Sequence, residues 1–397
     1  MQEFSAETLK LSPNRISCNE HNRCDIVIWR IIMKSVGRKI AVIALMSLFA
    51  FISLGAKTEN SSVFEEIDPV YFETDVAKLI QIHRVGDVTK KRDALIQYVW
   101  GGKGFPSSKQ PAKVEEKIED ERYANLFKAG LKQIDRITML MDPGLISMDP
   151  GLISIAYHFI PKKGNNKLII YHQGHRGDFI TGIDTIAAFL GKGYSVMAFS
   201  MPLKGMNNKP TVYLERFGKF KVERHEHLKL LADPIKYFME PMAVGLNYAA
   251  KFKYDQVHMS GISGGGWTTT IYAAIDTRIM HSFPVAGSYP IYLRSESGRD
   301  WGDFEQTLPD LYRIANYPEL YAMGSFGNGR KQIQMLNQYD SCCFAGVKWR
   351  TYEKAVKEAV ADLGKGQFRV FLDNSHKEHK ISAQALKVIF DDLESLR

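Results

Sequence analysis

Residues 256–277 read Gln-Val-His-Met-Ser-Gly-Ile-Ser-Gly-Gly-Gly-Trp-Thr-Thr-Thr-Ile-Tyr-Ala-Ala-Ile-Asp-Thr. The stretch predicts an apolar strand over 256–260, a turn of small residues, and a helix over 267–277. Ser263 lies in the turn, within the pattern Gly-x-Ser-x-Gly. A serine on a sharp turn between a strand and a helix is presented to substrate, and small neighbours let the chain reverse its direction. The pattern therefore makes Ser263 a candidate nucleophile.

The same glycines are open to two other interpretations, and the neighbouring residues argue against both. A phosphate-binding loop needs a lysine after its second spaced glycine, but this chain has Trp267 after Gly266. A dinucleotide-binding fingerprint needs a glycine at the place that Ser263 occupies. A glycine turn without any chemistry stays open as the alternative.

The rest of the chain from about residue 153 alternates predicted strands with predicted helices. Such alternation indicates an α/β protein with a mostly parallel central sheet and helices on both faces. The predicted strands cover 153–161, 167–172, 194–200, 256–260, 281–286, 331–338 and 367–372. The predicted helices cover 181–190, 233–252, 267–277, 308–323, 351–363 and 381–396.

A serine hydroxyl becomes a strong nucleophile only when a base takes its proton and a carboxylate orients that base. On a strand–turn–helix nucleophile the chain order is serine, acid, histidine, each in a loop after a strand. Asp340 follows the strand predicted over 331–338 and lies among semi-buried residue types, so it is the preferred acid. Asp373 competes from the end of the last strand, and Asp300 and Asp303 compete from a loop. An aspartate that only forms a turn also stays open.

Two histidines three residues apart are candidates for the base. His379 lies just before the last predicted helix, which Ser382 is placed to cap. Because loops of this kind present the imidazole near the helix start, His379 is preferred. His376 is the alternative base.

The negative charge that develops on an attacked carbonyl needs N–H donors. One donor is expected from Gly264, directly after the serine. The second is expected on the loop after the strand 167–172, which reads Gln-Gly-His-Arg-Gly over 173–177. Gly174 lets the backbone approach substrate there, and the amide of His175 is the preferred donor. His172 and Arg176 receive no role, because an ordinary strand-to-helix turn explains them equally well.

With Ser263, Asp340, His379 and this loop in order, residues from about 135 to 397 resemble the α/β-hydrolase superfamily. The resemblance implies a serine hydrolase that cleaves a carboxylic ester through an acyl-enzyme, without a cofactor. The expected partner is a small-molecule or acylated substrate. A peptidase or acyltransferase with the same triad, or a non-catalytic binding protein on the same scaffold, stays open.

The N-terminal part of the chain has the pattern of a targeting segment. From Met33 a basic start precedes about 15 apolar residues and the small residues Gly55-Ala56, which is typical of a secretory signal peptide. Residues 33–56 therefore predict export to the periplasm or beyond, with residues 1–32 as a doubtful upstream extension. A signal-anchor is the alternative, and then membrane contact is expected only through 33–56.

Residues 57–135 predict a helical N-terminal segment, with helices over 72–82, 93–100 and 115–131, ahead of a hydrolase domain over 136–397. The heptapeptide Met-Asp-Pro-Gly-Leu-Ile-Ser occurs twice in tandem over 141–154. Its Pro-Gly turn signal places it in a hairpin. Successive side chains of a strand point to opposite faces of the sheet, so an insertion of seven residues would exchange the two faces. One copy is therefore expected to bulge into a loop.

Charge and cysteine content exclude several classes of protein. The net charge is +8, but residues 1–57 carry eight Lys/Arg and four Asp/Glu, which leaves 44 against 40 for the remainder. A nearly balanced body argues against the clustered basic surface that binds nucleic acid, and no such partner is expected. The adjacent Cys342 and Cys343 match no zinc motif and are expected to be two small, semi-buried side chains. No metal site is predicted.

Overall fold

The computed structural model describes residues 62–141, 151–294 and 300–395. The predicted signal segment over 33–56, the extension before it and most of the tandem repeat lie outside the described residues. Within the described ranges, no helix is both long and apolar enough to cross a membrane.

A nine-stranded sheet organises the described chain, in the spatial order β1-β2-β3-β5-β4-β8-β9-β10-β11. In this spatial order, the six strands β5, β4, β8, β9, β10 and β11 pair in parallel. The pairs β1–β2, β2–β3 and β3–β5 are antiparallel. The mostly parallel sheet predicted from the sequence is therefore confirmed. The strands are β1 (Lys113–Glu115), β2 (Leu131–Met141), β3 (Leu152–Pro161), β4 (Lys167–His172), β5 (Ser195–Phe199), β8 (Gln256–Ile262), β9 (Ile279–Val285), β10 (Lys331–Asn337) and β11 (Gln367–Asp373).

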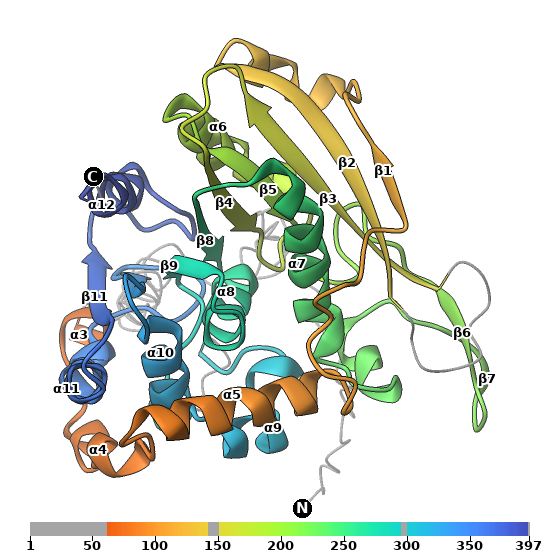
Figure 1. Cartoon of the computed structure of the whole chain (residues 1–397). Coiled ribbons are helices and arrows are strands. Elements are labelled where there is room, and N and C mark those ends of the chain that lie inside the picture. The colour runs from red at the N-terminus through yellow and green to blue at the C-terminus, as the bar shows by residue number, and fades with distance from the viewer. Residues whose placement is uncertain (1–61, 142–150, 295–299, 396–397) are drawn as a thin grey trace, which may run out of the picture. The chain divides into compact units, whose positions relative to one another are not determined.

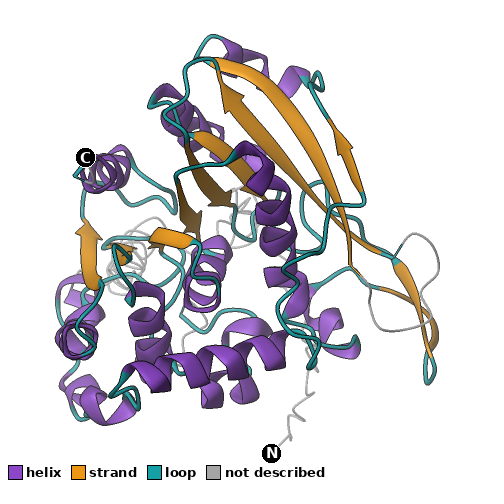
Figure 2. Cartoon of the chain, in the orientation of Figure 1, coloured by secondary structure: helices purple, strands orange, loops and turns teal. Residues whose placement is uncertain are grey.

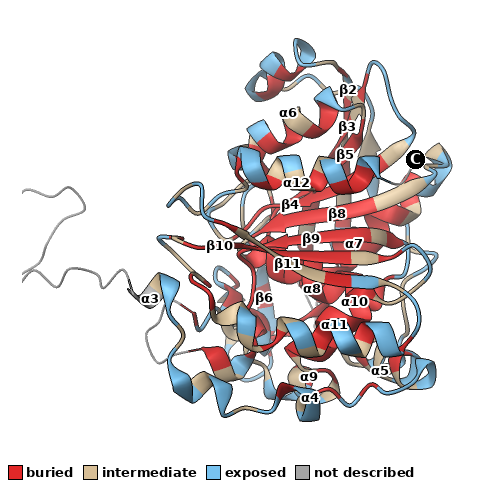
Figure 3. Cartoon of the chain, turned by 90° about the vertical axis from the view of Figure 1, so that its left-hand side faces the viewer, coloured by how far each residue is buried: buried red, intermediate tan, exposed pale blue. Residues whose placement is uncertain are grey.

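Helices cover both faces of this sheet (Figures 1 and 2). The central strands are buried along most of their length, as parallel strands between two helical layers must be (Figure 3). One apolar core lies under α6 (Ile183–Gly191) and α12 (Ala383–Glu394). The other lies under α7 (Lys236–Ala249), α8 (Gly264–Ile275), α10 (Tyr317–Ser325) and α11 (Glu353–Asp362).

The N-terminal segment combines helices with strands. It contains α3 (Ser62–Glu65), α4 (Val76–Leu79) and α5 (Val85–Val99). The α5 helix is tied to the second helical layer, because Arg92 donates to the Ala274 carbonyl at 3.0 Å and Lys91 pairs with Glu319 at 3.1 Å.

The helix predicted over 115–131 is wrong. Residues 113–115 form β1, residues 121–127 form a 3-10 helix, and β2 begins at Leu131 after Gly130 with φ 101°. The residues that ended the expected helix begin a strand because β2 buries Leu131, Ile134 and Ile137 in the sheet. Tertiary packing here outweighs the local charge pattern.

The helix predicted over 308–323 is divided. It forms α9 (Pro309–Ile314) and α10, because Asn316 caps the second helix and accepts from the Glu319 amide at 3.1 Å.

The tandem repeat joins two paired strands, as expected of a hairpin. β2 ends at Met141 and β3 begins at Leu152, and these two residues pair across the antiparallel ladder. The expected bulge falls on 142–150, outside the described residues. A second hairpin, β6 (Thr211–Leu214) with β7 (Gly218–Lys221), forms a separate two-stranded sheet.

Candidate active site

Ser263 occupies a strained turn between β8 and α8. Its backbone has φ 60° and ψ −126°, a conformation that L-residues rarely adopt. The turn is fixed from both sides, because the Ser263 amide donates to the Val285 carbonyl at 2.9 Å and its carbonyl accepts from Trp267 at 2.9 Å. A Cβ on Gly266 would lie 2.5 Å from the Val285 oxygen, so that position has room only for glycine.

His379 and Asp340 form a close pair at the carboxyl ends of β11 and β10. Nδ1 of His379 lies 2.8 Å from Oδ2 and 3.0 Å from Oδ1 of Asp340. An ionised carboxylate only accepts, so Nδ1 carries the proton in the neutral ring and Nε2 keeps its lone pair. Nε2 is buried and has no hydrogen-bond partner among the described residues. The pair therefore presents a free basic nitrogen.

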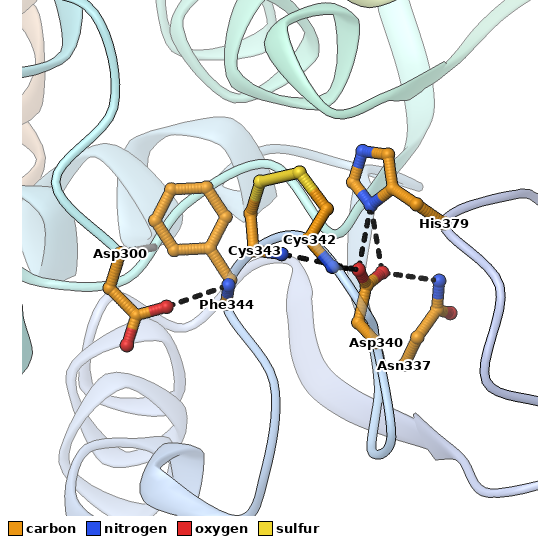
Figure 4. The surroundings of a disulfide bond; sticks show 7 residues. All are labelled: Asp300, Asn337, Asp340, Cys342, Cys343, Phe344 and His379. Carbon is orange, nitrogen blue, oxygen red and sulfur yellow. Dashed lines mark hydrogen bonds and ion pairs between the residues drawn. A yellow bond between two sulfur atoms is a disulfide. The ribbon is translucent and has the colours of Figure 1, made fainter. Parts of the chain in front are cut away.

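Asp340 is held as an anion by several donors (Figure 4). Its oxygens accept from the amides of Cys342 at 2.7 Å and Cys343 at 3.1 Å, and from the Asn337 side chain at 3.1 Å. Burial alone would raise the pKa of Asp340, but the hydrogen bond and charge of His379 and the two cysteine amides outweigh it, so the pKa is lowered. Such a carboxylate can orient an imidazole and stabilise its protonated form.

Cys342 and Cys343 are joined by a disulfide bond directly beside Asp340 (Figure 4). Both side chains are semi-buried, as expected, but the bond between them was not predicted. Spacing motifs for disulfides describe distant cysteines, and adjacent ones give no such signal. The bond closes the turn whose two amides donate to the acid.

His376 lies beside a different acid. Its Nε2 is 3.4 Å from Oδ2 of Asp373, while Asp373 also accepts from the amide of Ser375 at 2.9 Å and from the hydroxyl of Ser382. Ser382 in turn accepts from the Ala385 amide at 3.0 Å, which confirms it as the cap of α12. Asp373 thus supports the start of the last helix.

The remaining acid candidates also have other partners. Asp300 accepts from the Phe344 amide at 2.8 Å and pairs with Lys348 at 3.0 Å. Asp303 faces two histidines away from the Asp340 pair. Of the four candidate acids, only Asp340 is paired with His379.

Ser263 and His379 line one cavity of about 430 Å³, a size that accepts a small ligand. The structure has no hydrogen bond between the Ser263 hydroxyl and the imidazole within the described ranges, a common state in enzymes without bound substrate. Polar side chains also border the cavity, among them Gln173, Arg176, Asp184 and Lys380.

The loop after β4 lies close to the serine. Gly174 and His175 line the same cavity. A Cβ on Gly174 would lie 2.6 Å from Cβ and 3.2 Å from Oγ of Ser263, so only glycine lets the backbone come this near. Gly264 begins α8 directly after Ser263, and the His175 ring packs against it.

A cluster of four side chains beside this loop was not predicted. The His175 and His225 rings face the carboxylates of Asp303 and Glu305. From the sequence, only the backbone amide of His175 was expected to contribute to a site, and Asp303 was one of the candidate acids. The one available sequence signal is the pair of carboxylates two residues apart in Asp303-Phe304-Glu305.

Comparison with known proteins reveals similarity in structure but not in sequence. No protein-family model matches the sequence, and no curated protein is similar to it at a significant level. A solved acetyl xylan esterase from Paenibacillus sp. R4 superposes with a TM-score of 0.51 at 11% identity, over 83% of this chain and 99% of that one. An acetyl xylan esterase from Thermoanaerobacterium gives 0.48 at 12% identity, over 84% and 99%. The strand order and the first of these similarities show an α/β-hydrolase fold, as predicted.

Proposed function

We propose that this protein is a serine hydrolase that cleaves a carboxylic ester through an acyl-enzyme, with Ser263 as nucleophile, His379 as base and Asp340 as the acid that orients it. The observation that carries the proposal is the His379 imidazole. Its Nδ1 is held by Asp340, while its Nε2 has no hydrogen-bond partner among the described residues and its ring lines the same cavity as Ser263.

The arrangement supports acyl transfer in two steps. In the first, Nε2 of His379 takes the Ser263 proton as Oγ attacks the ester carbonyl, and the same proton goes to the departing alcohol. In the second, His379 takes a proton from water as it attacks the acyl-enzyme, and returns that proton to Ser263 Oγ as the bond to the acyl group breaks and the acid is released. Asp340 keeps Nδ1 protonated and balances the charge of the imidazolium.

Two backbone amides are proposed to hold the oxyanion. Gly264 lies at the N-terminus of α8, where N–H groups and the helix dipole favour negative charge. The His175 amide lies on the loop that Gly174 brings against Ser263. Together they would stabilise the tetrahedral intermediate from two sides.

The proposed substrate is a small acylated molecule met outside the cytoplasm. The cavity volume fits a small ligand, and a solved structure of the same fold is named an acetyl xylan esterase. Export is proposed from the sequence of residues 33–56, and the Cys342–Cys343 disulfide is of a kind that persists in oxidising compartments. N-terminal sequencing of the mature protein tests the export proposal.

The proposal is tested by labelling the protein with a fluorophosphonate probe and by assaying p-nitrophenyl esters of increasing chain length alongside acetylated sugars. Wild type should react with the probe and hydrolyse at least one short ester. Ser263→Ala should do neither. A wild type that fails to label, or a Ser263→Ala variant that labels equally, would overturn the hydrolase proposal.

A further inference from the structure

The cluster beside the oxyanion loop has the composition of a metal site. It comes from three separate segments: the loop after β4, the 3-10 helix His225–Leu230, and the 3-10 helix Phe304–Gln306 with its preceding residue. One ligand atom from each side chain lies within 4.8 Å of all the others, and the four side chains are His175, His225, Asp303 and Glu305.

The separations between nitrogen and oxygen atoms are close to those around a tetrahedral ion, and those of His225 match them best. Nε2 of His175 lies 3.0 Å from Asp303 Oδ2 and 3.1 Å from Glu305 Oε1. Nδ1 of His225 lies 3.5 Å and 3.4 Å from the same two oxygens. Zinc with bonds of about 2.0–2.2 Å to nitrogen and oxygen places its ligand atoms roughly 3.4 Å apart.

His225 is oriented as a ligand. Its Nε2 lies 2.9 Å from the Pro202 carbonyl oxygen, which only accepts, so Nε2 carries the proton. In the neutral ring Nδ1 then carries no proton, and its lone pair faces the two carboxylates of Asp303 and Glu305. The side chain is 2% exposed and Nδ1 has no hydrogen-bond partner among the described residues. A backbone carbonyl behind the distal nitrogen is the usual support of a metal-binding histidine.

Glu305 also has an unsatisfied atom. Its side chain is fully buried, and Oε2 has no hydrogen-bond partner in the described chain. A buried carboxylate without compensation is costly. A divalent cation would balance the charges of Glu305 and Asp303 together.

We propose a binding site for a divalent transition-metal ion, of which zinc is the best match, formed by four ligands: His175, His225, Asp303 and Glu305. Two imidazoles with two carboxylates suit zinc and its neighbours in the first transition row, whereas magnesium and calcium prefer oxygen ligands alone. The site contradicts the expectation of no metal drawn from the sequence. It does not depend on the proposed hydrolase function.

The competing arrangement is a cluster in which both histidines are protonated. Burial alone would lower the pKa of His225, but the Asp303 and Glu305 carboxylates outweigh it and raise the pKa to about 9. The His175 distances of 3.0 and 3.1 Å are also those of hydrogen bonds, but the longer His225 distances favour a metal. A charged imidazole should approach a carboxylate to about 2.7–2.9 Å, and His225 does not.

The test is metal binding by the full chain, first stripped with a chelator and dialysed. Titration with zinc, followed by calorimetry and by elemental analysis of the recovered protein, should give one ion per chain. Cobalt should bind with the intense visible absorption of a tetrahedral site. Magnesium and calcium should not compete. No stoichiometric zinc binding by stripped wild type would overturn the proposal in favour of the protonated cluster.

Variants assign the ion to this cluster. His225→Ala and Asp303→Asn should each weaken zinc binding by at least about tenfold. His227→Ala is the matched control, because His227 lies on the same 3-10 helix outside the cluster, and it should bind as wild type does. Asp303 is 43% exposed, so Asp303→Asn should fold even where His225→Ala does not. Unchanged affinity in Asp303→Asn would also overturn the site.

Ser263→Ala separates this proposal from the hydrolase proposal. It should bind zinc with the wild-type stoichiometry and affinity while losing esterase activity. Zinc binding that disappears in Ser263→Ala would place the ion elsewhere and overturn the assignment. Failure of esterase activity alone leaves the zinc result standing.

Discussion

Two Asp–His pairs lie next to each other at the carboxyl ends of the last two strands, and they differ in what surrounds the carboxylate. Asp340 lies 2.8 Å from His379 and also accepts from the Cys342 amide and from the Asn337 side chain at the end of β10. Asp373 lies 3.4 Å from His376, and its oxygens accept from Ser375 and from the cap of α12. Residue type alone therefore does not distinguish a pair suited to chemistry from a pair that supports a helix.

The second difference is what the imidazole can reach. The His379 ring lines the cavity that contains Ser263, whereas His376 does not line it. A catalytic pair therefore needs an acid in close contact with the histidine and a second ring nitrogen that faces the cavity of the nucleophile.

The largest difference is expected between the two histidines. His379→Ala should lower kcat/KM by about 10⁴-fold or more, because the serine loses its base. His376→Ala, the matched control, should stay within about tenfold of wild type, since its ring does not line the cavity. Steady-state ester hydrolysis measures both. Equal losses in the two variants would discard the assignment of His379.

Exchanging each acid for its amide should affect different properties. Asp340→Asn should reduce kcat by about 10³- to 10⁴-fold, because the amide favours the wrong tautomer of His379. Asp373→Asn should leave kcat nearly unchanged and lower the free energy of unfolding by about 1–3 kcal/mol, because it disturbs the hydroxyl and amide donors at the α12 cap. Kinetics and urea denaturation together check the pair. A catalytic loss from Asp373→Asn as large as that from Asp340→Asn would contradict the comparison.

The same two variants should change the response to acid. Burial would raise the pKa of both Asp340 and Asp373, but their hydrogen bonds lower it below the ordinary value. A carboxyl with a lowered pKa stabilises the fold above its unfolded pKa of about 4, and this contribution is lost as the pH falls through the native pKa. Each Asn variant should therefore lose less stability than wild type on acidification from pH 6, measured as Tm. An equal loss would mean that the carboxyl is not stabilised as an anion.

A smaller effect is expected from the glycine beside the serine. Gly174→Ala would bring a methyl group to 2.6 Å from Ser263 Cβ, so the loop must shift and kcat should fall by about 10²-fold. Gly191→Ala is the control: it lies at the end of α6 with no atom within 4 Å of the added Cβ, and it should keep full activity. Wild-type activity in Gly174→Ala would show that this loop does not contribute to the site.

The smallest effect is expected from the disulfide. Reducing the Cys342–Cys343 bond should lower kcat by about two- to tenfold, because the amides that hold Asp340 lose a constraint on their turn. The variant with both cysteines changed to serine should show the same loss and no further response to reductant. A reductant that slows this variant as much as wild type would be acting elsewhere.

The sequence was sufficient for most of the sheet, because buried parallel strands are short apolar runs between helices with clear ends. β4 covers the predicted residues 167–172 without change, and β10 ends one residue before the prediction. It failed over 115–131, where an acidic-to-basic pattern resembled a helix and the decisive factor was the burial of Leu131 and Ile134 against the sheet. A local sequence pattern does not reveal which side chains become buried against a distant part of the chain.

For the site, the order of residues along the chain predicted those side chains that directly follow a strand. Asp340 and His379 were chosen because each follows a strand, and the structure places them in contact. The histidine cluster was missed because His225 and Glu305 lie on short 3-10 helices 80 residues apart, and neither carries a spacing motif. The adjacent disulfide was missed for a related reason, since no sequence rule distinguishes two neighbouring thiols from a bond between them.

The backbone of Ser263 has an evolutionary consequence. At φ 60° and ψ −126° a residue with a side chain costs about 1–3 kcal/mol, and glycine would relieve much of that strain. Ser263→Gly should therefore melt higher than wild type and be inert. Selection for thermal stability alone would therefore favour glycine at this position, although the glycine variant is inactive. The serine is retained only while catalytic turnover is also under selection.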